Sequence, residues 1–336
     1  MDAVELDRPE RLRAWLARQR TVHEVRADGQ GGWHWQALAA DDAAPFDPPS
    51  VLPPFSAKGF FFAEREQLFR FDGGQFLGLM PEVEPQVLFG LHACDLRAVA
   101  YQDQFFAADP HYQARRRASL LVALECRHSC ADGFCSLVGS GPRVHDGDAD
   151  LILLPLSQGW RLLVASAAGA EALRGFAVPV APDDGEAERQ ENARRVAAEQ
   201  GPQAEVARGI QALHAGRITE EAWEAVGLRC LGCSGCTTVC PTCSCFAPLD
   251  VADEEGGVAR ERVWDSCLYE AFQREASGHN PTASAGQRVR RFWYHKFGEA
   301  FREQFDAYGC VGCGRCDRVC PGGIGVHGVM GRVAKP

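Results

Sequence analysis

Two cysteine runs with identical spacing constrain this chain more than any other feature. Residues 230–241 read CLGCSGCTTVCP and residues 310–321 read CVGCGRCDRVCP, so the pattern C-x2-C-x2-C-x3-C-P occurs twice. This spacing is the ligand run of two-cluster ferredoxins, in which three cysteines hold one [4Fe–4S] cluster and the fourth ligates the other cluster. The chain is therefore expected to fold so that the two runs lie together.

The exchange of the fourth ligand assigns eight cysteines to two clusters. The longer x3 step and the proline turn the chain away, so the fourth thiolate of each run points at the neighbouring site. The first thiol set is therefore Cys230, Cys233, Cys236 and Cys320, and the second thiol set is Cys310, Cys313, Cys316 and Cys240. Two clusters held in this way are close together and form a path for single electrons.

Other uses of cysteine fit this pattern poorly. Disulfide frameworks belong to small secreted domains, whereas this chain has 336 residues and begins MDAVELDRPERLRAWL, without an apolar signal segment. Structural zinc uses paired C-x2-C units, and here the x2 step is doubled and ends in Cys-Pro. Fifteen cysteines without a secretion signal favour metal ligation in a reducing compartment, and we expect a cytoplasmic protein.

The composition along the chain predicts two domains. Residues 1–183 have the pattern of a mixed α/β domain that opens with a helix over residues 8–20. A proline-rich segment, DPPSVLPPFSAKGFFF, is expected to be an extended connector leading into a strand. Two buried strands, 87–91 and 119–125, flank a helix over 95–108 that Asp109-Pro110 should end, which makes a βαβ unit with parallel strands. Two more strands are predicted at 151–156 and 160–166.

Residues 184–336 are predicted to form a largely helical dicluster ferredoxin domain, since no further convincing strand is found there. Thr219 is the expected N-cap of a helix that leads into the first cysteine run. Between the runs, aromatic residues recur every three or four positions and predict one aromatic helical face: Tyr294, Phe297, Phe301, Phe305 and Tyr308.

Four further cysteines in the α/β domain form a third thiol set. Cys94 and Cys126 follow the two strands of the βαβ unit, and the carboxyl ends of parallel strands are where open α/β sheets bind ligands. The loop ECRHSCADGFCS adds Cys130 and Cys135, with a turn at Asp132-Gly133. Four cysteines suit a third [4Fe–4S] cluster, although zinc or buried unreactive thiols remain alternatives.

The rest of the sequence offers no terminal catalyst. Neither a dinucleotide-binding glycine motif nor a P-loop is present, and no stretch reaches the ~18 apolar residues of a membrane helix. The net charge of −10 disfavours nucleic acid, and the basic, aromatic segment 288–297 fits a packed helix better than a nucleic-acid platform. Cys243, Cys245 and Cys267 remain unassigned, and we expect them to pack near a cluster.

The motifs together resemble a known family. The stretches GLHACDLRAV, ECRHSCADGFCSLVG, CLGCSGCTTVCPTCSCF, WDSCLYEAF, RVRRFWYHKFG and CVGCGRCDRVCP look like the iron–sulfur beta subunit of cytoplasmic sulfhydrogenases, which are NAD(P)-linked [NiFe] hydrogenases. The resemblance runs from about residue 50 to the end. One departure is Ser244, which stands where the family usually has an aromatic residue.

The resemblance implies an electron-transfer subunit without catalysis of its own. Its clusters would relay electrons between a flavoprotein subunit, which binds FAD and NAD(P), and the small subunit of a [NiFe] hydrogenase, whose large subunit completes the complex. The order of motifs is also similar to that of the electron-transfer subunit of anaerobic sulfite reductase. The alternative function is therefore to feed a sirohaem subunit.

Overall fold

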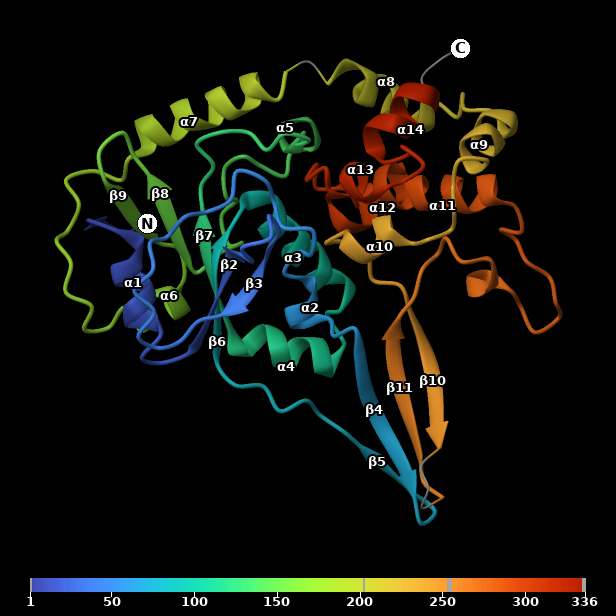
Figure 1. Cartoon of the computed structure of the whole chain (residues 1–336), viewed down its shortest axis with the longest axis horizontal. Coiled ribbons are helices and arrows are strands. Elements are labelled where there is room, and N and C mark those ends of the chain that lie inside the picture. Colours follow the sequence, from blue (N-terminus) through green and yellow to red (C-terminus); the bar gives the residue numbers. More distant parts are fainter. Residues whose placement is uncertain (1, 202, 253–255, 334–336) are drawn as a thin grey trace.

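A computed structural model describes residues 2–201, 203–252 and 256–333 (Figure 1). A seven-stranded sheet organises the first half of the chain, in the order β1-β9-β8-β7-β6-β2-β3. Its four central strands, β8, β7, β6 and β2, are parallel, whereas β1, β9 and β3 pair antiparallel with their neighbours. The strands are Asp2–Leu6 (β1), Thr21–Ala27 (β2), Trp33–Ala37 (β3), Gln86–Leu91 (β6), Ser119–Leu124 (β7), Leu151–Pro155 (β8) and Trp160–Val164 (β9).

The four predicted strands of this sheet are confirmed, and so is the parallel pairing of β6 with β7. Both strands are buried almost throughout, as the continuous apolar runs predict. The seven helices of this half are Pro9–Leu16 (α1), Lys58–Phe61 (α2), Ala93–Phe105 (α3), Pro110–Ala118 (α4), Cys135–Val138 (α5), Ala167–Ala172 (α6) and Glu186–Glu199 (α7).

Asp109-Pro110 begins a helix and does not end one, so the predicted helix over 95–108 is corrected to Ala93–Phe105. The carboxylate of Asp109 accepts a hydrogen bond from the backbone N–H of Tyr112 at 2.8 Å, and Pro110 occupies the first turn of α4. This is the usual chemistry of a helix N-terminus, because proline has no N–H to leave unpaired there.

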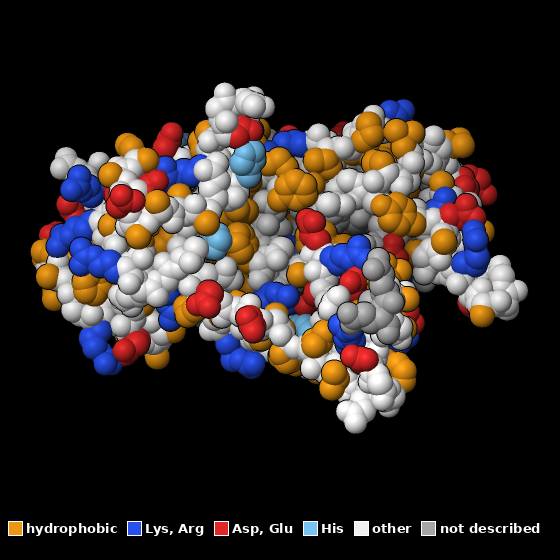
Figure 2. Space-filling view, turned by 60° about the horizontal axis from the view of Figure 1, so that its bottom comes forward, with side chains coloured by type: hydrophobic (Ala, Val, Ile, Leu, Met, Phe, Trp, Pro, Cys, Tyr) orange, Lys and Arg blue, Asp and Glu red, His pale blue; other side chains and the backbone are white. Residues whose placement is uncertain are grey.

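A second sheet corrects the expectation that no strand follows residue 184. Its order is β10-β11-β4-β5, all antiparallel, and its strands are Arg65–Asp72 (β4), Gln75–Gly78 (β5), Phe246–Ala252 (β10) and Val258–Trp264 (β11). It therefore joins strands from both sides of the predicted domain limit. The sheet projects from the body as an arm, which we call the β arm (Figure 1), and Figure 2 shows it pointing toward the viewer.

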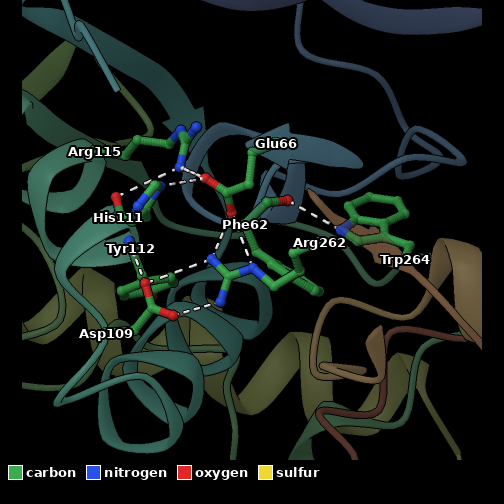
Figure 3. A network of polar contacts seen from close by, with 8 residues as sticks. All are labelled: Phe62, Glu66, Asp109, His111, Tyr112, Arg115, Arg262 and Trp264. Atoms are coloured by element: carbon green, nitrogen blue, oxygen red, sulfur yellow. Dashed lines mark hydrogen bonds and ion pairs between the residues drawn. The ribbon is translucent and has the colours of Figure 1, made fainter. Parts of the chain in front are cut away.

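A buried ionic network anchors the base of the β arm (Figure 3). Arg262 of β11 donates to the carboxylates of Glu66 in β4 and Asp109 before α4. Glu66 also accepts from Arg115 at 2.7 Å and lies 3.0 Å from Nδ1 of His111. Each charge in this network has an oppositely charged partner, as burial of charged groups requires.

The remaining helices enclose the two cysteine runs. They are Ala204–His214 (α8), Glu220–Gly227 (α9), Gly235–Val239 (α10), Glu270–Gln273 (η1), Ala285–Phe297 (α11), Glu299–Phe305 (α12), Arg315–Val319 (α13) and Val326–Val333 (α14). Thr219 caps α9 by accepting from the N–H of Ala222, as predicted. Within the described ranges, no helix is long and apolar enough to span a bilayer.

The predicted aromatic helix is two helices. Gly298 separates α11 from α12, and Tyr308 follows the end of α12, so the five aromatic residues do not share one helix. Phe297 and Phe305 are nevertheless buried, and the rings of Phe297 and Tyr308 lie 5.8 Å apart. The chain turns between the two helices because Gly298 is extended, with φ −67° and ψ 139°.

Helix α7 lies along the seven-stranded sheet, although it follows the predicted domain limit (Figure 1). Its Arg189 donates to the buried carboxylate of Glu125, just after β7, and Asn192 donates to the carbonyl of Pro155 at 3.2 Å. These contacts bring the helix past the loop that carries the third thiol set.

Candidate iron–sulfur sites

The two cysteine runs adopt the same backbone conformation. In each run a left-handed glycine precedes the second cysteine, Gly232 at φ 62° and Gly312 at φ 63°. Each run then has a left-handed N-cap, Ser234 at φ 61° or Gly314 at φ 68°, followed by the five-residue helix α10 or α13. The repeated left-handed residues curl each loop around its own cysteines, which explains how close spacings present three thiols to one side.

The four cysteines of the first thiol set line one pocket. Cys230, Cys233 and Cys236 come from the first run, and Cys320 reaches the same pocket from the end of the second run. The remaining lining is apolar or neutral, including Leu268 and Trp293, and it contains no carboxylate among the described residues. An all-sulfur donor set in an apolar lining suits a thiolate-bound iron–sulfur cluster, because oxygen-preferring cations would find no ligand there.

The second thiol set is also drawn together across the two runs. The charges of Cys313 and Cys240 act on Cys310, and those of Cys310 and Cys313 act on Cys316. Burial comes first among the causes that raise the pKa of the Cys310 and Cys316 thiols. Such crowded buried thiols are unfavourable as free thiolates and become favourable when iron takes the place of the protons.

The third thiol set meets at the carboxyl edge of the parallel strands, as predicted. Cys94 lies in the first turn of α3 after β6, and Cys126 lies just beyond β7. These two cysteines and Cys130 and Cys135 line one pocket, whose described lining holds no carboxylate, lysine or arginine. Burial, followed by the charge of Cys135, raises the pKa of Cys130 to about 11.

The third set and the second cysteine run are in direct contact. Cys313 lines the pocket of the third set. The N–H of Phe134 donates to the carbonyl of Gly312 at 2.8 Å, and a Cβ on Gly312 would lie 2.6 Å from the backbone nitrogen of Cys135. Only glycine permits this approach. Gly312 therefore has two roles: its left-handed backbone curls the second run, and its lack of a side chain lets the second run contact the loop of the third set.

The buried cations Arg315 and Lys296 lie among the thiols, and the cysteine spacing gave no indication of them. Arg315 contacts Asp95 between the second and third sets, and Lys296 donates to Thr242 Oγ1 at 2.8 Å, which lies 3.2 Å from the sulfur of Cys240. Burial alone would lower the pKa of Lys296, but the charges of Cys240 and Cys243 raise it well above its usual value. Both cations offset negative charge on the thiolates. Arg315 belongs to the second cysteine run, and a positive charge next to Cys316 was the only feature of the sequence that pointed to its role.

No three His, Cys, Asp or Glu side chains of the described residues converge closely enough to hold a single metal ion. The thiols of the first and third sets instead line pockets, which is the arrangement that a multi-atom cluster with four cysteine ligands requires. The residues present therefore fit the [4Fe–4S] group that the sequence predicts.

Comparison with known proteins agrees with this chemistry. Residues 229–324 match the family described as a 4Fe-4S dicluster domain. No solved structure matches the chain. The sulfhydrogenase 2 subunit beta of Pyrococcus furiosus is 30% identical over an alignment of 287 residues, and the match covers 82% of this chain and 80% of that protein. The chain therefore belongs to the family of sulfhydrogenase beta subunits and is an iron–sulfur subunit for electron transfer.

Proposed function

We propose that this chain carries single electrons through three [4Fe–4S] clusters, one in each thiol set. The proposal rests on the observation that neighbouring thiol sets adjoin one another. Cys313 of the second set borders the pocket of the third, and the first set takes Cys320 from the run that supplies the rest of the second. The spatial order is therefore third set, second set, first set. Bound [4Fe–4S] clusters each take up and release one electron.

The side chains of this path have two tasks. The twelve cysteines hold the clusters, and the buried cations Arg315 and Lys296 stabilise the negative charge that each added electron brings. Backbone donors assist, since the N–H of Ile324 lies 3.4 Å from the sulfur of Cys320 and that of Gly312 lies 3.5 Å from the sulfur of Cys310. Hydrogen bonds to the sulfurs favour the reduced state and so raise the potential.

The two ends of the path reach the surface. At the first set, Cys233 is exposed, and Leu228 and Leu231 are 90% and 73% exposed. At the third set, the loop residues Arg127 and His128 are exposed beside Cys126. Exposed leucines beside a redox site suit a protein partner better than a small substrate.

These two ends are where we place the companions in the reducing cytoplasm. One is a flavoprotein subunit that binds FAD and NAD(P), and the other is the small subunit of a [NiFe] hydrogenase bound to its large subunit. The family membership supports this arrangement over the feeding of a sirohaem subunit.

Oxygen-free purification with the companion subunits tests the proposal. About twelve irons per chain are expected, together with three components in a redox titration followed by electron paramagnetic resonance. A count of about eight irons per chain would show that the third cluster is absent. A colourless, metal-free protein would contradict the whole proposal. Identification of the co-purifying subunits by mass spectrometry tests the partners, and a sirohaem protein among them would contradict the hydrogenase assignment.

Replacement of one third-set cysteine isolates that site. Cys94→Ala should lower the iron content from about twelve to about eight per chain, and the resonance signals of the other two clusters should persist. Ser136→Ala is the matched control, because Ser136 lies next to Cys135 in α5 but supplies no thiol. The control should keep all three signals.

A further inference from the structure

The three cysteines outside the thiol sets are gathered at one pocket. Cys243, Cys245 and Cys267 line a cavity of about 340 Å³, together with Lys296 and Ser244. Cys243 and Cys245 follow the first cysteine run, whereas Cys267 comes after β11. Their meeting is therefore a product of the fold and not of sequence proximity.

The hairpin of β10 and β11 brings Cys245 and Cys267 together. Phe246 of β10 pairs with Trp264 of β11, and the N–H of Asp265 donates to the carbonyl of Cys245 at 3.0 Å, which extends the pairing by one position. Cys267 lies two residues further along, lines the same pocket as Cys245, and its side chain and backbone both act on the Cys245 thiol. The hairpin thus places the two thiols in the lining of one pocket.

The two thiols differ in exposure and in acidity. Cys245 is half-buried, whereas Cys267, which lines the same pocket, is 2% exposed. The hydrogen bond from Cys267 lowers the pKa of Cys245 to about 6, with help from Lys296 and against the effect of burial, while the same bond raises the pKa of Cys267. An accessible thiolate next to a buried thiol is the arrangement that thiol–disulfide exchange uses.

The pair also lies close to the second thiol set. Lys296 acts electrostatically on Cys245 and Cys267 and also on Cys240 and Cys310. Its ammonium group donates to Thr242 Oγ1, which in turn contacts the sulfur of Cys240. The buried Lys58 also acts electrostatically on Cys240 and Cys245, so two lysines link the pair with the proposed cluster ligand Cys240.

We propose that Cys245 and Cys267 form a redox-active dithiol that reduces a disulfide-containing substrate at this pocket, with electrons drawn from the second thiol set. The source of the electrons rests on the proposed function, whereas the pairing of the two sulfurs does not.

The chemistry balances in two stages. The Cys245 thiolate attacks one sulfur of the substrate disulfide, the substrate S–S bond breaks, and one substrate thiolate leaves. Cys267 loses its proton and displaces the second substrate thiolate, so that a Cys245–Cys267 bond forms and both substrate sulfurs leave as thiols after protonation. Two electrons, transferred singly, and two protons then break the Cys245–Cys267 bond and restore the dithiol.

Mass spectrometry of the oxygen-free, iron-loaded protein tests the pairing. Glutathione disulfide is the probe, followed by an acid quench, alkylation of free thiols and digestion. We expect a linked peptide that joins Cys245 to Cys267, and its loss after treatment with dithiothreitol. The Cys267→Ser variant should instead retain glutathione on Cys245, because the resolving thiol is gone. Cys243→Ser is the control that should keep the link.

The outcomes separate the two parts of the proposal. Separate alkylation of Cys245 and Cys267 in protein with full iron content overturns the pair, and so does a link that contains Cys243. A linked peptide in protein that never holds iron keeps the pair but overturns the proposed function. In the coupling test, a photoreduced deazaflavin donates single electrons to the oxidised protein. The link should then disappear in the wild type and persist in Cys240→Ser, and its persistence in both overturns the coupling.

Discussion

Arg315 and Asp95 are joined by two parallel hydrogen bonds, from Nη1 to Oδ1 at 2.7 Å and from Nη2 to Oδ2 at 3.0 Å, and both side chains are buried. Arg315 precedes Cys316 and Asp95 follows Cys94, so this one ion pair fixes the second thiol set against the third. Arg315 Nε also donates to the carbonyl of Pro53 at 2.8 Å. All three guanidinium nitrogens thus donate to acceptors from the N-terminal half of the chain.

Removal of this arginine should strongly destabilise the folded protein. Arg315→Met leaves the carboxylate of Asp95 buried without its partner, which typically costs about 3–5 kcal/mol of unfolding free energy. Denaturant unfolding under nitrogen measures the loss. The exposed pair Arg260 and Asp250 is the matched control, since solvent screens it and Arg260→Met should cost far less unfolding free energy than Arg315→Met. Equal losses from the two variants would show that burial does not set the strength of the first pair.

The exchange of ligands between the runs predicts crossed effects. Cys240→Ser should damage the cluster of the second thiol set, and Cys320→Ser that of the first, because each thiol reaches across. Electron paramagnetic resonance of each variant distinguishes the two signals. Loss of the signal from the variant's own run would contradict the assignment.

Substitution of the matching N-caps of the two runs should change the stability by different amounts. Ser234→Gly removes a left-handed serine with an unpaired buried hydroxyl, so the stability should change by less than about 1 kcal/mol. In Gly314→Ser the new Cβ would lie 2.4 Å from the carbonyl oxygen of Asp132, in the loop of the third set. That variant should lose about 1–3 kcal/mol and part of its iron. Thermal unfolding and iron counting compare the two, and similar behaviour would contradict this prediction.

Acid should weaken the anchor of the β arm. Burial alone would raise the pKa of Glu66, but hydrogen bonds from Arg262 and Arg115 lower it below its usual value. A lowered folded pKa stabilises the protein above the unfolded value of about 4.3, and this contribution is lost as the pH falls through the folded value. Glu66→Gln should therefore be destabilised by the same amount at pH 7 and pH 6, about 3–5 kcal/mol.

The difference in unfolding free energy between Glu66→Gln and wild type should begin to narrow only below about pH 4.3. It should be smallest once the pH is below the folded pKa of Glu66, where both proteins carry a neutral side chain at this position. Urea unfolding followed by circular dichroism measures it, and comparison of the two proteins cancels the loss of iron that they share in acid. A difference that already narrows between pH 7 and pH 6 would show that another group titrates.

The local patterns predicted the centre of the fold well. The runs at 87–91 and 119–125 are continuous and apolar, and such runs specify buried parallel strands wherever they occur. The positions at which these strands end were enough to predict that Cys94 and Cys126 share one edge of the sheet. The strand Val258–Trp264 was missed because three consecutive charged residues, Arg-Glu-Arg, stand at its centre. The burial of Arg262 depends on its pairing with Glu66 and Asp109, which come from distant parts of the chain.

The same limit applies to the sites. Spacing predicts a grouping of the cysteines of the two runs, because ligand geometry is local and the exchange is a property of the motif, and the structure brings the first of these groups to one pocket. It could not predict that Cys313 would border the third set, nor that Lys296 would lie beside Cys240, since these contacts depend on tertiary packing. The meeting of Cys245 with Cys267 needed the hairpin of β10 and β11, which the sequence did not reveal.

The β arm has a consequence for producing this protein alone. Its outer strands β5 and β10 have free edges, and Phe76 and Leu77 are 72% and 48% exposed in the described part of the arm. Open strand edges with apolar side chains invite pairing between copies. A host that makes this polypeptide at high concentration should therefore accumulate aggregates, whether or not iron is inserted.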